Sequence, residues 1–337
     1  MRLFQRHWRF LFSIVPCALL MGAAVPGAAA QDSGLGIAWK AGPHFAGKKK
    51  VRKSISGAAC APVLPPVCIA ALDEKNRTQF FTIADRTLKP GPVMAIVEDN
   101  GNGDPDTEGA AYADGFFYLL GSHGLSRKKG KFHPSSFLMF RFPVDKSTGK
   151  PAFDISADTV APEITRSDRL RQVIRKSPGV IGDYAEKPLG KKAGGANLEG
   201  LAVIGKRMYV GFRGPSSKGR AYILSVDVDR LFGDGDLAPV IFTLELGKNI
   251  GIRDLAAVSG GLLILAGPVQ EEGLYSIFRW DLKNPPQKLK DLVMPDPEVK
   301  AETLLVLGQQ DDSYDVLVLY DGIKDGGPRE YRLSYSR

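Results

Sequence analysis

One stretch indicates the fold best: Asn197-Leu198-Glu199-Gly200-Leu201-Ala202-Val203, followed by a turn at Gly205-Lys206 and by Arg207-Met208-Tyr209-Val210-Gly211-Phe212-Arg213. Short runs of apolar and aromatic residues that are bounded by Gly, Asp, Asn or Pro are typical of β-strands. The stretch therefore predicts a β-hairpin whose first strand begins at an acidic residue, Glu199.

This pattern recurs along the chain. Further copies cover residues 107–124, 253–268 and 301–322, with a weaker one at 68–85. The acids that open the three clear copies are Glu108, Asp254 and Glu302. Recurring hairpins are typical of β-propellers, in which each blade is a four-stranded sheet. A sandwich of two sheets is the main alternative, but it would not need an acid at the same place in every copy.

The spacing of the acids bears on the number of blades. From Glu108 to Glu302 the intervals are 91, 55 and 48 residues, and the last two each fit one blade of about 40–50 residues. The first interval is too long for one blade. We interpret the excess as an insertion near 150–196, where Asp168–Lys176 has the pattern of a helix that Pro178 ends. The predicted fold class is all-β: a single β-propeller of about six four-stranded blades, with a partly helical insertion.

The first 30 residues have the features of a secretory signal peptide. Three arginines precede a mostly apolar stretch at 10–24, and Ala28-Ala29-Ala30 offers small residues for cleavage before Gln31. The apolar stretch is shorter than the about 20 residues of a spanning helix; an uncleaved membrane anchor is the alternative. We expect a periplasmic or secreted mature protein without a stable membrane span. The predicted domains are a signal peptide at 1–30, a flexible basic segment at 31–53 and the propeller at 54–337.

The composition is that of a globular protein. Apolar residues make up 44% and charged residues 24% of the 337 residues, which excludes collagen, a coiled coil and wholesale disorder. Residues 1–30 hold three arginines and no acid, so cleavage would lower the formal net charge from +8 to +5. The basic residues occur in short runs without the interleaved aromatic residues that stack on bases. We expect no nucleic-acid partner, and a monomer whose ligand is an unknown small molecule or protein.

Two cysteines remain after cleavage of the leader, Cys60 and Cys68. They are separated by a short loop in a compartment that permits disulfides. A Cys60–Cys68 disulfide ahead of the first strand is the economical interpretation, and two buried free thiols are the alternative.

A candidate site follows from the predicted fold. The first strand of each blade lines the central channel of a propeller, so the opening acids gather on one face, and the hairpins return to that face. Converging carboxylates repel one another unless they are paired or bound to a cation. Arginines would pair with them, or a Ca²⁺ ion, which prefers oxygen ligands, would neutralise them. The candidate ligand-binding residues at this channel mouth are Glu108, Ser122, His123, Glu199, Arg213, Arg253, Asp254, Glu302 and Asp321.

The role of these acids stays open between two interpretations. Acids at blade starts cap backbone N–H groups of neighbouring strands, which is a structural role; a ring with arginine and histidine would instead bind a ligand. We expect Glu199 to be structural, because Arg213 returns beside it. We expect His123 to be functional, because nothing in its strand requires an imidazole. No residue is assigned a catalytic role.

The loop at residues 99–106 is a second candidate for calcium. Oxygen-bearing side chains recur at Asn100, Asn102, Asp104 and Asp106, but Pro105 stands where a calcium loop requires Gly. An ordinary turn rich in Asp and Asn is the alternative. Calcium is the only cofactor that the sequence suggests.

Several motifs are distinctive as a set: Ser56-Gly57-Ala58-Ala59-Cys60, Cys68 with Asp73-Glu74, Thr107-Glu108-Gly109-Ala110-Ala111-Tyr112, Gly121-Ser122-His123-Gly124 with Arg127-Lys128, Asn197-Leu198-Glu199-Gly200-Leu201-Ala202, Arg213-Gly214-Pro215 and Gly251-Ile252-Arg253-Asp254-Leu255-Ala256. Together they resemble the uncharacterised bacterial family called domain of unknown function 3616, over almost all of the chain after the leader. This resemblance implies a propeller and no established reaction. The E-G-L-A element alone is also similar to phytase-like esterase propellers and to the strictosidine synthase and gluconolactonase group.

Three functions fit these observations. We favour a non-catalytic propeller that binds a ligand or partner at the channel mouth. The second is a calcium-assisted hydrolase of phosphate or carboxyl esters, in which arginines and His123 would bind the anion. The third is a structural interaction module of the cell envelope.

Overall fold

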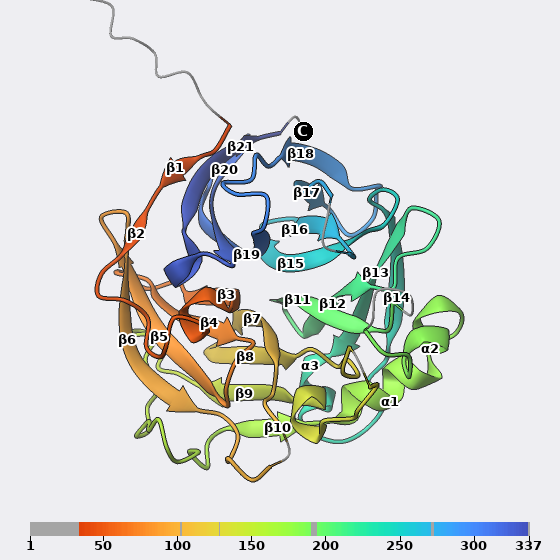
Figure 1. The fold of residues 1–337 in the computed structure, drawn as a ribbon, viewed down its shortest axis with the longest axis horizontal. Helices are drawn as coiled ribbons and strands as arrows, with labels where there is room; N and C mark the ends of the chain where they lie inside the picture. Colours follow the sequence, from red (N-terminus) through yellow and green to blue (C-terminus); the bar gives the residue numbers. More distant parts are fainter. Residues whose placement is uncertain (1–33, 102, 128, 190–193, 271–272, 336–337) are drawn as a thin grey trace, which may run out of the picture. The chain divides into compact units, whose positions relative to one another are not determined.

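The computed structural model describes residues 34–101, 103–127, 129–189, 194–270 and 273–335. The predicted leader and cleavage site lie outside the described residues. Five sheets, antiparallel except for one short added strand, are arranged around one axis, as Figure 1 shows. The described part is therefore a five-bladed propeller, and the expectation of about six blades was wrong. In the described part of the chain, no helix combines the length and apolar character that a membrane crossing requires.

Each blade is built from consecutive strands, with its first strand innermost. Blade 1 contains β3 (Ile55–Ala61), β4 (Val67–Leu72), β5 (Arg77–Ala84) and β6 (Thr87–Ala95), to which the short β2 (Lys40–Ala41) is added in parallel. Blade 2 contains β7 (Thr107–Ala113), β8 (Phe116–Gly121), β9 (Met139–Pro143) and β10 (Thr165–Ser167). Blade 3 contains β11 (Asn197–Ile204), β12 (Arg207–Gly214), β13 (Arg220–Asp227) and β14 (Val240–Glu245).

The last two blades complete the ring. Blade 4 contains β15 (Ile250–Val258), β16 (Gly261–Pro268), β17 (Ser276–Trp280) and β18 (Gln287–Asp291). Blade 5 contains β19 (Lys300–Gln309), β20 (Ser313–Asp321) and β21 (Arg329–Ser334), and its outermost strand is β1 (Ile37–Ala38) from the other end of the domain. The inner strands β3, β7, β11, β15 and β19 contact one another in this order, and β19 contacts β3.

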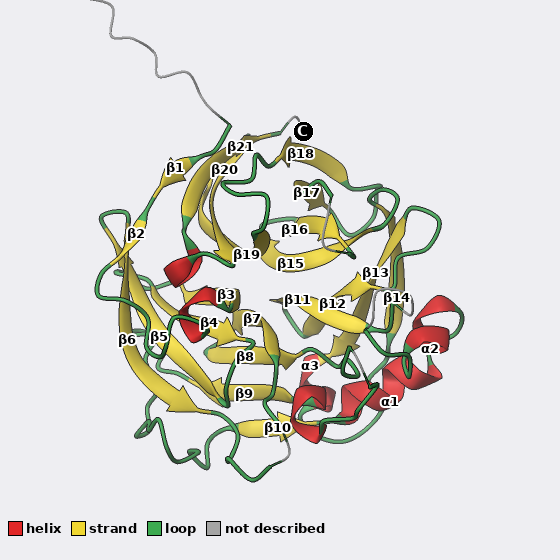
Figure 2. Cartoon of the chain, in the orientation of Figure 1, coloured by secondary structure: helices red, strands yellow, loops and turns green. Residues whose placement is uncertain are grey.

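The 91-residue interval between Glu108 and Glu199 contains an insertion and no extra blade. It contains α1 (Arg169–Lys176) and α2 (Val180–Tyr184), which lie beside blades 2 and 3 in Figure 2. Leu170 and Ile174 on one side of α1 are buried in the same apolar cluster as Phe212 of blade 3. The predicted helix is therefore confirmed. The predicted insertion near 150–196 is confirmed in part, because β10 within this range belongs to blade 2. The remaining helical elements are α3 (Val228–Leu231) and the 3₁₀ turns Val51–Lys53, Pro134–Phe137 and Lys324–Gly326.

The core consists of apolar layers between neighbouring blades. Phe80 of blade 1 packs edge-to-face against Phe117 of blade 2, with ring centroids 6.1 Å apart, and against Phe142 at 6.0 Å. Similar clusters lie between the other pairs of neighbouring blades. Burial of these side chains is the main favourable term in folding, and it fixes the inner strands around the channel.

The Cys60–Cys68 disulfide is present. It joins two residues that face each other directly in β3 and β4. The bridge therefore ties the first hairpin of blade 1 together, within the strands and not ahead of them.

Candidate functional site

Every inner strand has a one-residue β-bulge close to its first residue. The extra residues, which we call the bulge ring, are Ser56, Glu108, Glu199, Arg253 and Glu302. A bulge takes one residue out of the ladder and changes the direction of its side chain. The five blades thus present three glutamates, one arginine and one serine at equivalent positions around one end of the channel.

The residue of blade 4 that is equivalent to the glutamates is Arg253, and not Asp254 as the sequence pattern suggested. The Asp254 carboxylate accepts hydrogen bonds from the backbone N–H groups of Leu255 (2.8 Å) and Leu304 (2.7 Å). It therefore caps backbone donors and links blade 4 to blade 5. This is the structural role that sequence reasoning had left open for the set.

A buried ion-pair network connects three members of the bulge ring. Glu199 Oε1 accepts hydrogen bonds from Arg213 Nη1 (2.8 Å) and Asn197 Nδ2 (3.0 Å). Arg253 Nη1 lies 3.3 Å from Glu199 Oε2 and 3.0 Å from Glu302 Oε1. Arg253 is completely buried, and its Nη2 donates to the Pro268 carbonyl at 2.6 Å. The predicted proximity of Arg213 to Glu199 is confirmed.

The two glutamates of this network differ in how readily they ionise. Burial disfavours the ionised form of Glu199, but Arg213 and Arg253 outweigh it, and the pKa of Glu199 lies below its usual range. Burial and the Glu199 charge raise the pKa of Glu302 to about 8, against the opposing effect of Arg253. Glu199 is thus the ionised centre of the network.

A pocket of about 360 Å³ lies beside this network, mainly between blades 1 and 2. Its walls come from the strand ends and loops on the face where the inner strands begin. They include Gly124 and Leu125 after β8, and Leu189 from the insertion. Its acidic lining residues are Asp73, Glu74, Asp104, Asp106 and Glu108.

Two acceptor atoms at this pocket have no hydrogen-bond donor among the described residues. They are Oδ1 of Asn197, whose residue is 4% exposed, and Oδ1 of Asp73. Both residues line the pocket. A buried acceptor without a donor is costly, typically by about 1–3 kcal/mol. A hydrogen-bond donor that reached these two acceptors would therefore be stabilising.

Three carboxyl groups of the pocket, those of Asp73, Asp106 and Glu108, resist ionisation. Burial, with smaller contributions from Asp106 and Asp321, raises the pKa of Asp73 to about 7. Burial raises the pKa of Asp106 despite a hydrogen bond from Ser122. Burial and the charges of Asp106, Glu199 and Glu302 hold the pKa of Glu108 well above its usual value. Burial, the largest cause in each case, disfavours any charged group here, whereas a positive charge would relieve the smaller contributions of the neighbouring acids.

The other candidate residues lie deeper than the pocket or outside it. Of the nine proposed ligand-binding residues, Glu108 lines the pocket. Asp321 accepts a hydrogen bond from Lys300 at 2.9 Å, which places it at the same face. His123 is buried; its ring lies edge-on to Phe137 with centroids 5.7 Å apart, and its Nδ1 donates to the Gly121 carbonyl at 2.9 Å. Burial lowers the pKa of His123 to about 4, so the imidazole is neutral.

The structure bears on the calcium site that the sequence suggested in the loop at residues 99–106. Asp104 and Asp106 line the pocket, Asn100 is exposed, and Asn102 lies outside the described residues. No three side chains of His, Cys, Asp or Glu converge to hold a metal ion within the described ranges. The two aspartates therefore belong to the pocket wall.

Sequence reasoning overlooked three contributors to this site: Asp73, Asn197 and Lys300. Asp73 directly follows β4, the second strand of blade 1, and Asp321 is the last residue of β20, the second strand of blade 5. Asn197 and Lys300 are the first residues of inner strands β11 and β19. Alignment of the complete hairpins, with polar residues sought at both ends, would have found them.

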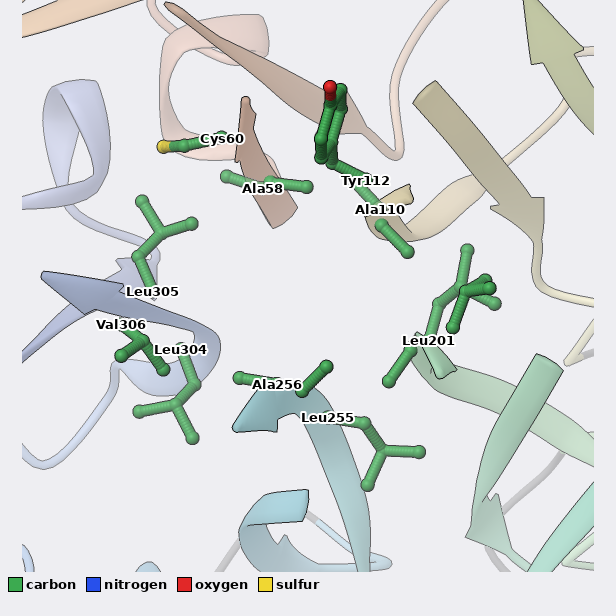
Figure 3. Close-up of a pocket in the computed structure, with 15 residues that line it drawn as sticks. Ala58, Cys60, Ala110, Tyr112, Leu201, Leu255, Ala256, Leu304, Leu305 and Val306 are labelled. Atoms are coloured by element: carbon green, nitrogen blue, oxygen red, sulfur yellow. The ribbon is translucent and has the colours of Figure 1, made fainter. Parts of the chain in front are cut away.

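The other end of the channel is apolar. Further along the same inner strands, a pocket of about 150 Å³ is surrounded by small and aliphatic residues, among them Ala58, Ala110, Leu201, Ala256 and Leu304 (Figure 3). Apart from Tyr112, the side chains in its described lining carry no hydrogen-bonding group. The ionisable side chains at the channel are therefore concentrated at the end with the bulge ring.

Comparison with known proteins identifies a family. The family model described as "Protein of unknown function (DUF3616)" matches residues 76–141 and 133–330. No curated protein matches. Among solved structures, the Malassezia sympodialis allergen Mala s 1 is 13% identical, with 83% of this chain and 77% of that chain covered and a TM-score of 0.38. GH43B of the Bacteroides ovatus xyloglucan locus is 12% identical, with 86% and 53% covered and a TM-score of 0.44.

Proposed function

The chain belongs to the DUF3616 family of proteins of unknown function, and from its geometry we propose that the propeller binds a small polar ligand in the pocket at the mouth of the channel. One observation carries this proposal: Asn197 lines the pocket, and its buried Oδ1 has no donor among the described residues. Buried polar atoms in folded proteins almost always have a partner. A bound molecule that donates a hydrogen bond would supply it.

The surroundings of Asn197 support a built site. Its Nδ2 is fixed by Glu199, and Glu199 is fixed by Arg213 and Arg253. A side chain held by a buried network has its orientation set before a ligand arrives, which lowers the entropic cost of binding. The volume of about 360 Å³ lies within the range of small-molecule sites.

A blocking variant tests the proposal. Ser126 lines the pocket without belonging to the ion-pair network, and Ser126→Trp would fill the pocket. Ser259 is exposed in the turn between β15 and β16, and Ser259→Trp is the matched control. Ligand-observed NMR with amino acids, diamines, monosaccharides and dicarboxylates as probes should show binding of at least one class to the natural chain and to S259W, but not to S126W. Binding that survives S126W, or no binding by any class, would contradict the proposal.

We further propose that the propeller acts outside the cytoplasm after removal of residues 1–30. The leader pattern of the sequence and the Cys60–Cys68 disulfide support this, because disulfides persist in oxidising compartments. N-terminal sequencing of the protein expressed from its full sequence in a Gram-negative host should give Gln31 as the first residue. Ala30→Arg should block this cleavage, because the site needs a small residue. Recovery of the natural chain with residue 1 retained would refute the proposal.

A further inference from the structure

We propose that the ligand of the channel-mouth pocket is an organic cation that carries ammonium or guanidinium groups. This inference rests on the proposed function and narrows it to one chemical class. Two independent observations carry it: the balance of charged side chains around the pocket, and the acceptors that lack donors.

The charge balance strongly favours a cation. Five carboxyl groups line the pocket among the described residues, while Arg127 is the only arginine or lysine in its described lining. Glu74 is paired with Lys50, and one Asp104 oxygen accepts from the Lys75 backbone N–H at 3.2 Å. Asp73, Asp106 and Glu108 form no ion pair within 4.0 Å that would neutralise them in the described structure.

The hydrogen-bonding groups favour the same class. Asn197 Oδ1 and Asp73 Oδ1 are acceptors without donors among the described residues. An ammonium group provides three N–H donors and a guanidinium five, and neither carries an acceptor. A cation of this kind would donate hydrogen bonds to both acceptors and favour the ionised forms of the neighbouring carboxyl groups. A neutral polyol would only donate hydrogen bonds.

A metal ion fits this pocket less well than an organic cation. No three carboxyl or imidazole groups of the described residues are placed to hold a metal ion together. Hydrogen bonds from N–H groups can instead reach acceptors spread over the pocket wall.

The charged and titratable groups that face Asp73 are Glu74, Asp106, Asp321 and Lys50, and three of these four are acids.

Three probes of similar length and different charge test the inference: butane-1,4-diamine, butane-1,4-diol and succinate. Titration calorimetry on the natural chain should give a dissociation constant for the diamine at least about tenfold lower than for the diol, and no binding of succinate. The diamine should bind more weakly as NaCl rises from about 0.05 to about 0.5 M, because salt screens charges. Its affinity should increase from about pH 6 to about pH 8, since Asp73 ionises in this interval.

Variants distinguish the inference from the proposed function. Asp73→Asn should weaken the diamine about tenfold or more and leave the diol unchanged, while Glu163→Gln, which removes an exposed carboxyl group outside the pocket lining, should leave both unchanged. If the diol or a monosaccharide binds in the S126W-sensitive pocket and the diamine does not, the cation inference fails and the proposed function stands. If no probe binds in that pocket, both fail. Tight binding of CaCl₂ alone, with no binding of the diamine, would also overturn the inference.

Discussion

Glu199→Gln should lower the free energy of unfolding by about 3–5 kcal/mol, the loss expected when one partner of a buried ion pair is removed. The side chain of Glu199 is 2% exposed, and its carboxylate faces two arginines, Arg213 and Arg253. Glutamine keeps the shape and removes the charge, so both guanidiniums lose their main counterion. Part of the loss is offset, because Glu302 ionises more easily once the Glu199 charge is gone.

Glu108→Gln is the matched control, since Glu108 occupies the equivalent bulge position in blade 2. Its pKa is well above the ordinary value, so folding takes up a proton and stability decreases as pH rises above the unfolded value. Glutamine removes this dependence. E108Q should therefore be neutral or stabilising at pH 7 and should flatten the rise in stability toward acid. Denaturant titrations of both variants at two pH values would decide, and a destabilised E108Q beside an unchanged E199Q would reverse these roles.

Gly251→Ala should be at least as damaging, with a loss of about 3 kcal/mol or more, or failure to fold. A Cβ atom at Gly251 would lie 1.9 Å from the backbone oxygen of Arg213 and 2.6 Å from its carbonyl carbon. These are backbone atoms at the contact of blade 3 with blade 4, so no side chain can turn aside. The change would also displace Arg213 from Glu199.

Gly308→Ala is the control for this prediction. Gly308 also lies in an inner strand, β19, and the nearest atom to its added Cβ is Asp315 Oδ2 at 3.8 Å. The melting temperature of G308A should be unchanged or slightly higher than that of the natural chain, because alanine restricts the unfolded chain. Equal melting of G251A and the natural chain would show that the two blades do not meet as closely as described.

The hairpins could be predicted from the sequence because their determinants are local. The strands around Phe116, Tyr209, Ile264 and Leu317 are apolar runs between turn residues, and the turn at Asp114-Gly115 has both residues at positive φ. The number of blades has no such local determinant. It depended on an average blade length, and the fourth strands of the blades vary from β1, with two residues, to β6, with nine.

The ring of acids was predicted only in part, for two identifiable reasons. Blade 1 carries Ser56 at the bulge position, so a search for acids placed its copy on β4 and β5, one strand late. In blade 4, Arg253 stands at the bulge and an acid follows it, so the repeat was aligned one residue off. A bulge shifts register by one residue, and the sequence pattern carried no sign of it.

The pairing of β1 with β21 gives the domain a seam at which its two chain ends meet. Trp39 Nε1 donates to Glu330 Oε2 at 2.9 Å, across a separation of 291 residues. During synthesis β1 has no partner until β21 has been made, so the ring closes only when the last blade of the propeller is complete. Contacts between such distant residues form late, since the whole loop must first be brought together. Because β1 has only two residues, the strand edge that stays unpaired until β21 has been made is short. This limits its capacity to pair with another chain.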